Sequence, residues 1–211
     1  PDRDTAVIAY FGDGASAQGD VGEAFVFAGV NNSPIVFFCQ NNQWAISEPN
    51  ERQMRIPIYL RPKGYGFPGI RVDGNDVLAT YAVTKACLDA AREGQGPSLI
   101  EAFTYRMGAH TTSDDPSKYR VSAEVEVWKL RDPIARLRNL LARAHGIPQS
   151  YFEEVDAEAE AIGTDLRERC LALPDPAPES MFAHVYAAPH PVMERERAEL
   201  AAYLASFEGT H

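Results

Sequence analysis

The chain has 211 residues, 45% of them hydrophobic, so it is long enough to bury one sizeable α/β core. Its net charge of −10 argues against nucleic acid as a partner. The three cysteines lack a zinc-like spacing and are typical of thiols in a reducing compartment, and no apolar run is long enough to span a membrane. We therefore expect a cytoplasmic protein that does not bind a membrane.

The first elements of the chain predict a strand, a helix and a second strand. Residues 5–11 form a continuous apolar run that is typical of a buried parallel strand. Residues 20–30 place apolar side chains on one face of a helix, and residues 35–39 form a second apolar run. In open α/β sheets, ligands bind outside the carboxyl ends of such strands. The residues that follow the two runs are therefore candidates for a binding site.

Those residues have the chemistry of a metal and phosphate site. Asp13 lies between Gly12 and Gly14, which let a ligand approach the backbone closely. Asn42 ends the Asn41-Asn42 pair after the second run and offers a neutral amide oxygen. Mg²⁺ takes a few protein oxygens and completes its shell with phosphate and water, so the pattern indicates Mg²⁺ with a diphosphate. The alternative is a tight turn after one strand and an Asn-rich loop after the other.

The middle of the chain repeats the strand and helix pattern. Residues 50–69 are expected to form a long surface loop, followed by a short strand at 70–74. A helix is expected at 75–91, where Asn75-Asp76 supplies the N-cap, and a mostly apolar strand follows at 98–105. The order indicates an α/β fold with a doubly wound, mostly parallel sheet and helices on both faces.

A polar loop at residues 106–120 follows the fourth strand. His110 lies in this loop, where an imidazole can donate to a diphosphate or exchange protons; the alternative is an exposed histidine without a role. Arg106 and Arg120 could bind phosphate, but we favour pairing with the acids Asp114 and Asp115 that would fold the loop. We expect the loop to be mobile without cofactor, because it lacks apolar anchors.

The remainder of the chain is predicted to be helical. We expect an α/β part at residues 1–122 and a helical C-terminal extension of the same domain at 123–211. Within the extension, the pattern predicts helices at 128–145, 148–171 and 192–207, a linker at 174–178 and a short extended segment at 181–186.

The motifs together resemble a known family. Gly12-Asp13-Gly14 is followed by Asn41-Asn42, with 26 residues between the two groups, and this combination matches the thiamine diphosphate motif. Residues 105–120 read Tyr-Arg-Met-Gly-Ala-His-Thr-Thr-Ser-Asp-Asp-Pro-Ser-Lys-Tyr-Arg. With that loop, the chain resembles the alpha subunit of the first component of 2-oxo acid dehydrogenase complexes, either branched-chain or two-subunit pyruvate dehydrogenases. The resemblance covers at least residues 5–135, is of the bacterial type, and implies that the sheet is incomplete at the N-terminus of this chain.

The resemblance implies a role for each residue of the motif. It implies Mg²⁺ ligation by Asp13, Asn42 and the backbone carbonyl of Trp44. His110 would contact the diphosphate and assist acyl transfer. The residues expected to border the diphosphate are Gly12, Gly14, Ala15 and Gln40, the last in place of an arginine of mitochondrial relatives.

The activity implied is thiamine diphosphate-dependent oxidative decarboxylation of a 2-oxo acid, with acyl transfer to the lipoyl group of an acyltransferase. A branched-chain acid is favoured over pyruvate, and the expected partner is a beta subunit in a heterotetramer of two alpha and two beta chains. Phosphorylation of Thr111 or Ser113 stays open. The alternatives are another thiamine diphosphate enzyme, transketolase-like or a simple decarboxylase, and a non-catalytic α/β interaction module.

Overall fold

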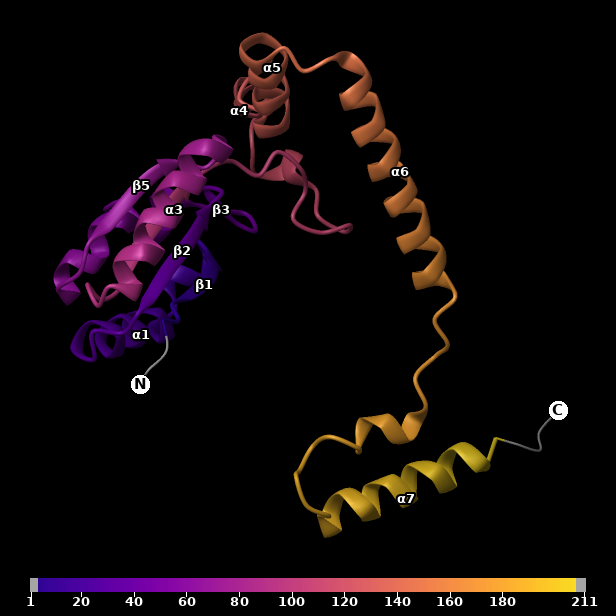
Figure 1. Ribbon diagram of the computed structural model, residues 1–211. Coiled ribbons are helices and arrows are strands. Elements are labelled where there is room, and N and C mark those ends of the chain that lie inside the picture. Colours follow the sequence, from indigo (N-terminus) through magenta and orange to yellow (C-terminus); the bar gives the residue numbers. More distant parts are fainter. Residues whose placement is uncertain (1–3, 208–211) are drawn as a thin grey trace. The chain divides into compact units, whose positions relative to one another are not determined.

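The computed structural model describes residues 4–207 (Figure 1). The chain divides into two compact units, with the boundary between Gln149 and Ser150. No helix in the described part of the chain combines the length and the hydrophobicity that crossing a membrane requires.

The first unit is built on a parallel sheet of four strands in the order β1-β2-β6-β5. The predicted strands are confirmed, each within a few residues. Their bounds are β1 Val7–Gly12, β2 Ile35–Asn41, β5 Gly69–Asp73 and β6 Ser98–Phe103.

The two helices α1 (Gly19–Val30) and α3 (Val77–Arg92) cover opposite faces of this sheet, as predicted. The reason is the strand order. The chain crosses from edge strand β1 to β2 in one direction along the sheet, and from the opposite edge strand β5 to β6 in the other direction. Because both crossovers are right-handed, a reversal of direction puts the connecting helices on different faces.

Strand β2 is buried on both faces and separates two apolar clusters. On one face, Phe25 of α1 contacts the rings of Phe37 and Phe67 edge-on, at centroid distances of 4.9 and 5.5 Å. On the other face, Phe38 of β2 packs in a cluster that includes Cys87 of α3. Burial on both faces explains why β2 reads as a continuous apolar run without alternation. The expectation of a buried strand at residues 5–11 was wrong in its burial, because β1 lies at the edge of the sheet and is only partly buried.

The segment between β2 and β5 is more ordered than the predicted surface loop. It contains a two-stranded hairpin and two short helical pieces, and the Ile58 side chain is fully buried in the cluster with Phe25. The elements are β3 Trp44–Ala45, β4 Glu48–Pro49, α2 Asn50–Gln53 and the 3-10 helix η2 Ile58–Tyr65. The expectation that residues 50–69 form an irregular surface loop was therefore wrong for the parts that belong to α2 and η2.

Two helices, α4 (Ser122–Lys129) and α5 (Pro133–His145), stand where one helix was predicted at 128–145. That prediction was wrong because Asp132 caps a new helix by accepting from Ala135 N–H at 2.8 Å, and Pro133 occupies the first helical position. Both helices belong to the first unit. The domain division at residue 122 stays a prediction.

The second unit is helical, as predicted. It comprises the long helix α6 (Gln149–Leu171), the 3-10 helix η4 (Pro178–Met181) and α7 (Pro191–Ala205). The extended segment predicted at 181–186 is wrong: these residues form the end of η4 and turns.

Candidate functional site

The two predicted motif ends lie side by side at the carboxyl edge of the sheet. Strands β1 and β2 pair in parallel, and their register places Gly12 opposite Gln40. Just beyond this pair, the backbone N–H of Asn42 donates to Oδ1 of Asp13 over 3.2 Å. The parallel pairing therefore brings together two motifs that are 26 residues apart in the sequence.

Asp13 carries the most unusual electrostatics of this site. Its side chain is only 1% exposed, and its second carboxylate oxygen, Oδ2, has no hydrogen-bond partner within the described residues. Burial raises the pKa of this carboxyl above its ordinary value, although hydrogen bonds from the backbone of Asp13 itself and of Asn42, the nearby Gln53 side chain and the charge of Arg106 act in the other direction. A buried carboxylate with an unpartnered oxygen is unfavourable unless a cation lies beside it. The site thus fits a metal ion.

The turn after Asp13 is held closely against the hairpin. Ser16 Oγ donates to the Asp13 carbonyl at 2.6 Å, within the one-turn 3-10 helix η1 (Ala15–Ala17). A Cβ atom on Gly14 would lie 2.7 Å from Cβ of Ala45, so only glycine fits there. Ala15 is exposed at the edge of the site.

The other two predicted metal ligands lie in the turn that follows β2. Oδ1 of Asn42 accepts the Trp44 N–H at 3.1 Å, which folds the turn locally. The Trp44 carbonyl accepts Nη1 of Arg106 at 3.3 Å and keeps a second lone pair for a cation. Among residues 4–207, no group of three or more His, Cys, Asp or Glu side chains is placed so that it could hold a metal ion. A site made of one carboxylate, one amide and one carbonyl would not form such a cluster.

Two residues of this hairpin have left-handed backbone conformations. Gln43 has φ +72°, and its side-chain amide donates to the Thr104 carbonyl at 2.7 Å. Ile46 has φ +56° although it is β-branched and exposed, a combination that is rare and strained. Its carbonyl accepts Nη2 of Arg106 at 2.7 Å, which helps to hold this conformation.

Behind the turn lies a polar network that sequence reasoning missed. Glu101 of β6 is fully buried, and its Oε1 accepts Nδ2 of Asn41 at 2.7 Å. Its Oε2 accepts the Tyr59 N–H at 3.0 Å. The signal in the sequence is a single acidic residue inside the apolar run at 98–103, where an unpaired charge would be costly.

The loop that carries His110 joins β6 to α4 and projects away from the sheet (Figure 1). His110 is exposed, and its backbone N–H donates to Oδ2 of Asp114 at 2.8 Å. The Tyr119 hydroxyl donates to the same oxygen at 2.6 Å. These bonds, from Tyr119 first and His110 second, hold the pKa of Asp114 below its ordinary value. Within the described residues, no hydrogen bond joins His110 directly to Asp13 or Asn42.

Both loop arginines fold the loop, in line with the role favoured from the sequence. Nη2 of Arg106 donates to the Tyr119 hydroxyl at 3.0 Å in addition to its hairpin contacts. Arg120 donates to the carbonyls of Arg106 and Met107, the latter at 2.8 Å. The acceptors differ from the expected ones, since they are mainly backbone carbonyls rather than the carboxylates of Asp114 and Asp115.

The model for the dehydrogenase E1 component family matches residues 2–179 of this chain. The chain belongs to that family. It is 48% identical to the 3-methyl-2-oxobutanoate dehydrogenase subunit alpha of Mycobacterium tuberculosis over 205 residues, 97% of this chain and 56% of the relative. It is 40% identical to the human mitochondrial 2-oxoisovalerate dehydrogenase subunit alpha, over 97% of this chain and 46% of the relative. It is 38% identical to the corresponding Bacillus subtilis subunit alpha, over 88% of this chain and 56% of the relative.

The chain therefore spans about half the length of the curated relatives that it matches. Family membership agrees with the resemblance inferred from the two motifs and from the loop at 105–120. The family match extends beyond the sheet through α4, α5 and α6 to η4.

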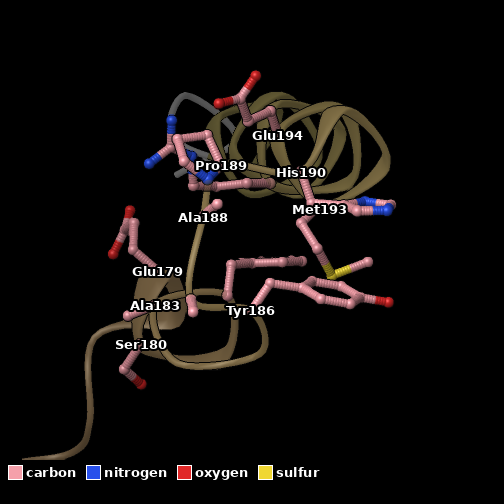
Figure 2. Close-up of a pocket in the computed structure, with 12 residues that line it drawn as sticks. Glu179, Ser180, Ala183, Tyr186, Ala188, Pro189, His190, Met193 and Glu194 are labelled. Atoms are coloured by element: carbon pink, nitrogen blue, oxygen red, sulfur yellow. The ribbon is translucent and has the colours of Figure 1, made fainter.

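A cavity of about 510 Å³ lies in the second unit, away in sequence from every predicted site residue. Figure 2 shows the Tyr186 and His190 rings and Met193 on one side of it. The two rings stack at a centroid distance of 4.4 Å. Nδ1 of His190 is buried and has no hydrogen-bond partner within the described residues. This cavity is local to η4 and α7 and contains none of the motif residues.

Proposed function

We propose that the complete protein is the alpha subunit of a thiamine diphosphate-dependent 2-oxo acid dehydrogenase, and that its substrate is a branched-chain 2-oxo acid. The observation that carries the proposal is the buried Asp13 carboxylate, which has one unpartnered oxygen at a sheet edge shared with Asn42. Family membership supports the reaction class. The names of the relatives support the substrate, since 3-methyl-2-oxobutanoate and 2-oxoisovalerate are the same branched acid.

The residues present fit Mg²⁺ and a diphosphate. Asp13, the amide oxygen of Asn42 and the carbonyl of Trp44 would hold the ion, because Mg²⁺ prefers few and hard oxygen ligands. The backbone at Gly12, where a Cβ atom would meet nothing within 4 Å, leaves room for a diphosphate to approach. Thiamine diphosphate, when bound, supplies the nucleophilic carbon and the electron sink for the loss of CO₂.

The other motif residues complete the proposed site. Ala15 would add a backbone N–H toward the diphosphate, and Gln40 would border it as a neutral side chain from the end of β2. His110 would donate a hydrogen bond or a proton from its exposed position, at which a lipoyl group on another protein can reach it. Asp114 would hold the loop in place by accepting the His110 backbone N–H.

The proposed partners are a beta subunit, in an assembly of two alpha and two beta chains, and a lipoyl-bearing acyltransferase. The relatives are named as alpha subunits, which supports a second kind of subunit. Exposed apolar side chains also favour a covered surface on α1, namely Val26, Phe27 and Val30. The cytoplasmic location is proposed because all three cysteines are free thiols.

The experiment that tests the function is dye reduction driven by 2-oxo acids. The complete protein is co-expressed with its beta-type partner and supplied with Mg²⁺ and thiamine diphosphate. The panel contains pyruvate and the 2-oxo acids of valine, leucine and isoleucine. We expect turnover with the branched acids, and loss of turnover in Asp13→Ala.

His110→Ala separates the two halves of the proposed reaction. We expect it to retain cofactor binding and to lose acyl transfer to a lipoyl domain. Preference for pyruvate would correct the substrate. If a well-assembled complex turned over none of the acids, the proposal would be refuted. The two alternatives, another thiamine diphosphate enzyme and a non-catalytic module, would then be favoured.

A further inference from the structure

A fully buried carboxylate lies behind the turn that carries two of the proposed metal ligands. Glu101 is in the interior of β6, flanked by β2 and β5, and is 0% exposed. Oε1 accepts from Asn41, and Oε2 accepts the Tyr59 N–H. Nη2 of Arg71, a side chain that is 38% exposed, is the nearest charge, at 3.5 Å from Oε1. Both oxygens of Glu101 therefore act as acceptors for groups on other elements.

The bond from Asn41 to Glu101 fixes which way the Asn41 amide faces. Because Nδ2 is used by Glu101, Oδ1 must face the other way, and there it accepts the Gln43 N–H at 2.9 Å. The same Oδ1 accepts Nδ2 of Asn50 at 2.7 Å. A reversed Asn41 amide would lose all three of these hydrogen bonds, because donors would face donors at Gln43 and Asn50 and acceptors would face each other at Glu101.

The turn held in this way is the one that presents Asn42 and Trp44. Gln43, with its backbone in the left-handed region, lies between these two residues, and its N–H is the group that Asn41 accepts. Asn50, at the start of α2, closes the hairpin from the other end, since its own N–H donates to the Gln43 carbonyl at 3.2 Å. The position of both proposed ligand oxygens thus depends on the orientation of one buried amide.

We propose that Glu101 is a positioning residue for the metal site, acting through Asn41 on the Asn42 and Trp44 oxygens. The inference rests on the Mg²⁺ site of the proposed function and extends it to a residue 60 positions away from Asn41 in the chain. Residues that orient metal ligands from behind typically change metal affinity by about 10- to 100-fold when they are replaced. Glu101 is expected to act in that range.

The test is calorimetric titration of Mg²⁺ into the complete protein, in its assembly, with thiamine diphosphate present. Glu101→Gln keeps the shape but replaces one acceptor by an NH₂ group, so a donor faces a donor at either Asn41 or Tyr59. We expect the Kd for Mg²⁺ to rise about tenfold. An unchanged Kd would overturn the proposal.

An exchange of the two side-chain types provides a rescue. When Asn41→Asp is combined with Glu101→Gln, the new amide at position 101 can donate to the new carboxylate at position 41, while the amide oxygen accepts the Tyr59 N–H. That carboxylate still accepts from Gln43 and Asn50, so each hydrogen bond of the network is restored. We expect the Kd to return to within about threefold of the original value. The remaining difference reflects the negative charge, which has moved from position 101 to position 41. A double variant no better than Glu101→Gln would contradict the proposed route through Asn41.

Two controls separate this inference from simple loss of stability and from failure of the metal site. Val36→Ala removes buried apolar atoms (0% exposed) near the start of β2, at the opposite end of the strand from Asn41 and in the cluster with Phe38 and Cys87. It should lower the melting temperature and leave the Kd for Mg²⁺ unchanged. A similar rise in Kd for Val36→Ala would show that Glu101 acts only through stability.

If the unmodified protein binds no Mg²⁺, the proposed function itself fails. If it binds Mg²⁺ and Asp13→Asn abolishes binding while Glu101→Gln does not change it, only the positioning role fails.

Discussion

The hairpin at residues 41–50 and the loop at 106–120 both carry proposed site residues, but they are held by different means. The hairpin begins in a buried strand, and its first side chain, Asn41, is 1% exposed and bonded to the interior carboxylate of Glu101. The loop lies outside the sheet, and His110 is exposed and held through its backbone by Asp114. The interior of the sheet therefore fixes the proposed metal side of the site, while surface contacts fix the proposed histidine side.

This difference matches what each region is proposed to do. Metal ligands must be in place within a fraction of an ångström before the ion binds, so they benefit from buried supports that cannot relax. A residue that meets a group on another protein must stay accessible, and accessible loops have low local stability. Arg106 is the link between the regions, since it donates to the hairpin carbonyls and to Tyr119.

The largest effect is expected from Asp13→Asn. It keeps the size of the side chain but removes the charge that the proposed ion needs, so Mg²⁺ affinity should fall by at least about 100-fold. Without Mg²⁺, the variant should unfold at the same temperature or higher, because a buried and unpartnered carboxylate oxygen has been removed. Calorimetric titration and thermal melts measure the two effects. A variant that binds Mg²⁺ normally would break the assignment of the buried region as the metal side.

The pH dependence gives the same residue a second test. Burial raises the pKa of Asp13 above 3.8, so protonation competes with Mg²⁺ at pH values where an exposed aspartate is already ionised. The Kd for Mg²⁺ should therefore rise as the pH falls through this raised pKa. In the metal-free protein, burying the Asp13 charge costs nothing below pH 3.8, where the carboxyl is protonated in both the folded and the unfolded state, and costs its full amount above the raised pKa of the folded state. The free energy of unfolding should therefore fall as the pH rises from 3.8 through the raised pKa. Asp13→Asn should lack this pH dependence.

The next effect tests the packing of the buried region. Gly14→Ala puts a methyl group 2.7 Å from Cβ of Ala45 and should lower the free energy of unfolding by about 1 to 3 kcal/mol. Gly12→Ala is the matched control, because a Cβ atom there meets nothing within 4 Å. Adding Ala45→Gly to Gly14→Ala should recover most of the loss. Urea unfolding measures all three, and equal losses in both single variants would refute the steric explanation.

The link between the regions should have a smaller effect. Arg106→Lys keeps the charge but loses the planar fork that reaches Ile46, Trp44 and Tyr119 together, and should cost about 1 to 2 kcal/mol. Hydrogen exchange should rise in both the hairpin and the loop. Arg52→Lys is the control, since Arg52 is exposed and forms only a surface pair with Glu48 among the described residues. Faster exchange confined to one region would show that Arg106 does not join them.

The smallest effect on global stability is expected from Asp114→Asn. It weakens the acceptor that holds the His110 N–H and the Tyr119 hydroxyl, so that the amide of His110 should exchange roughly tenfold faster. The melting temperature should stay unchanged, because the loop is exposed. Asp115→Asn is the control: its carboxylate accepts from Ser117 instead, so it should affect exchange there and leave His110 as it was. Unfolding of the whole unit by Asp114→Asn would break the contrast between the two regions.

Much of the fold could be predicted because its signals are local. Apolar runs predicted three strands of the sheet, and the short stretch at 70–74 predicted the fourth. Asp76, at the predicted cap, accepts the N–H groups of Leu78 and Ala79 at the start of α3. The motif at Gly12–Gly14 and Asn41–Asn42 identified both ends of the candidate site, because parallel strands bring their carboxyl ends to one edge. The hairpin after Asn42 could not be predicted, since its left-handed residues are Gln43 and Ile46 rather than glycine.

By itself, the sequence determined the strands, their polar ends and the chemistry of Asp13 and Asn42, because residue type and spacing act over a few positions. Only the tertiary structure decided the strand order and the contact between Asn41 and Glu101. The reason is that β6 pairs with β2 although a hairpin, several helices and β5 lie between them in the chain. A lone acidic residue in an apolar strand shows that a partner is needed, but the partner is chosen by the neighbouring strand.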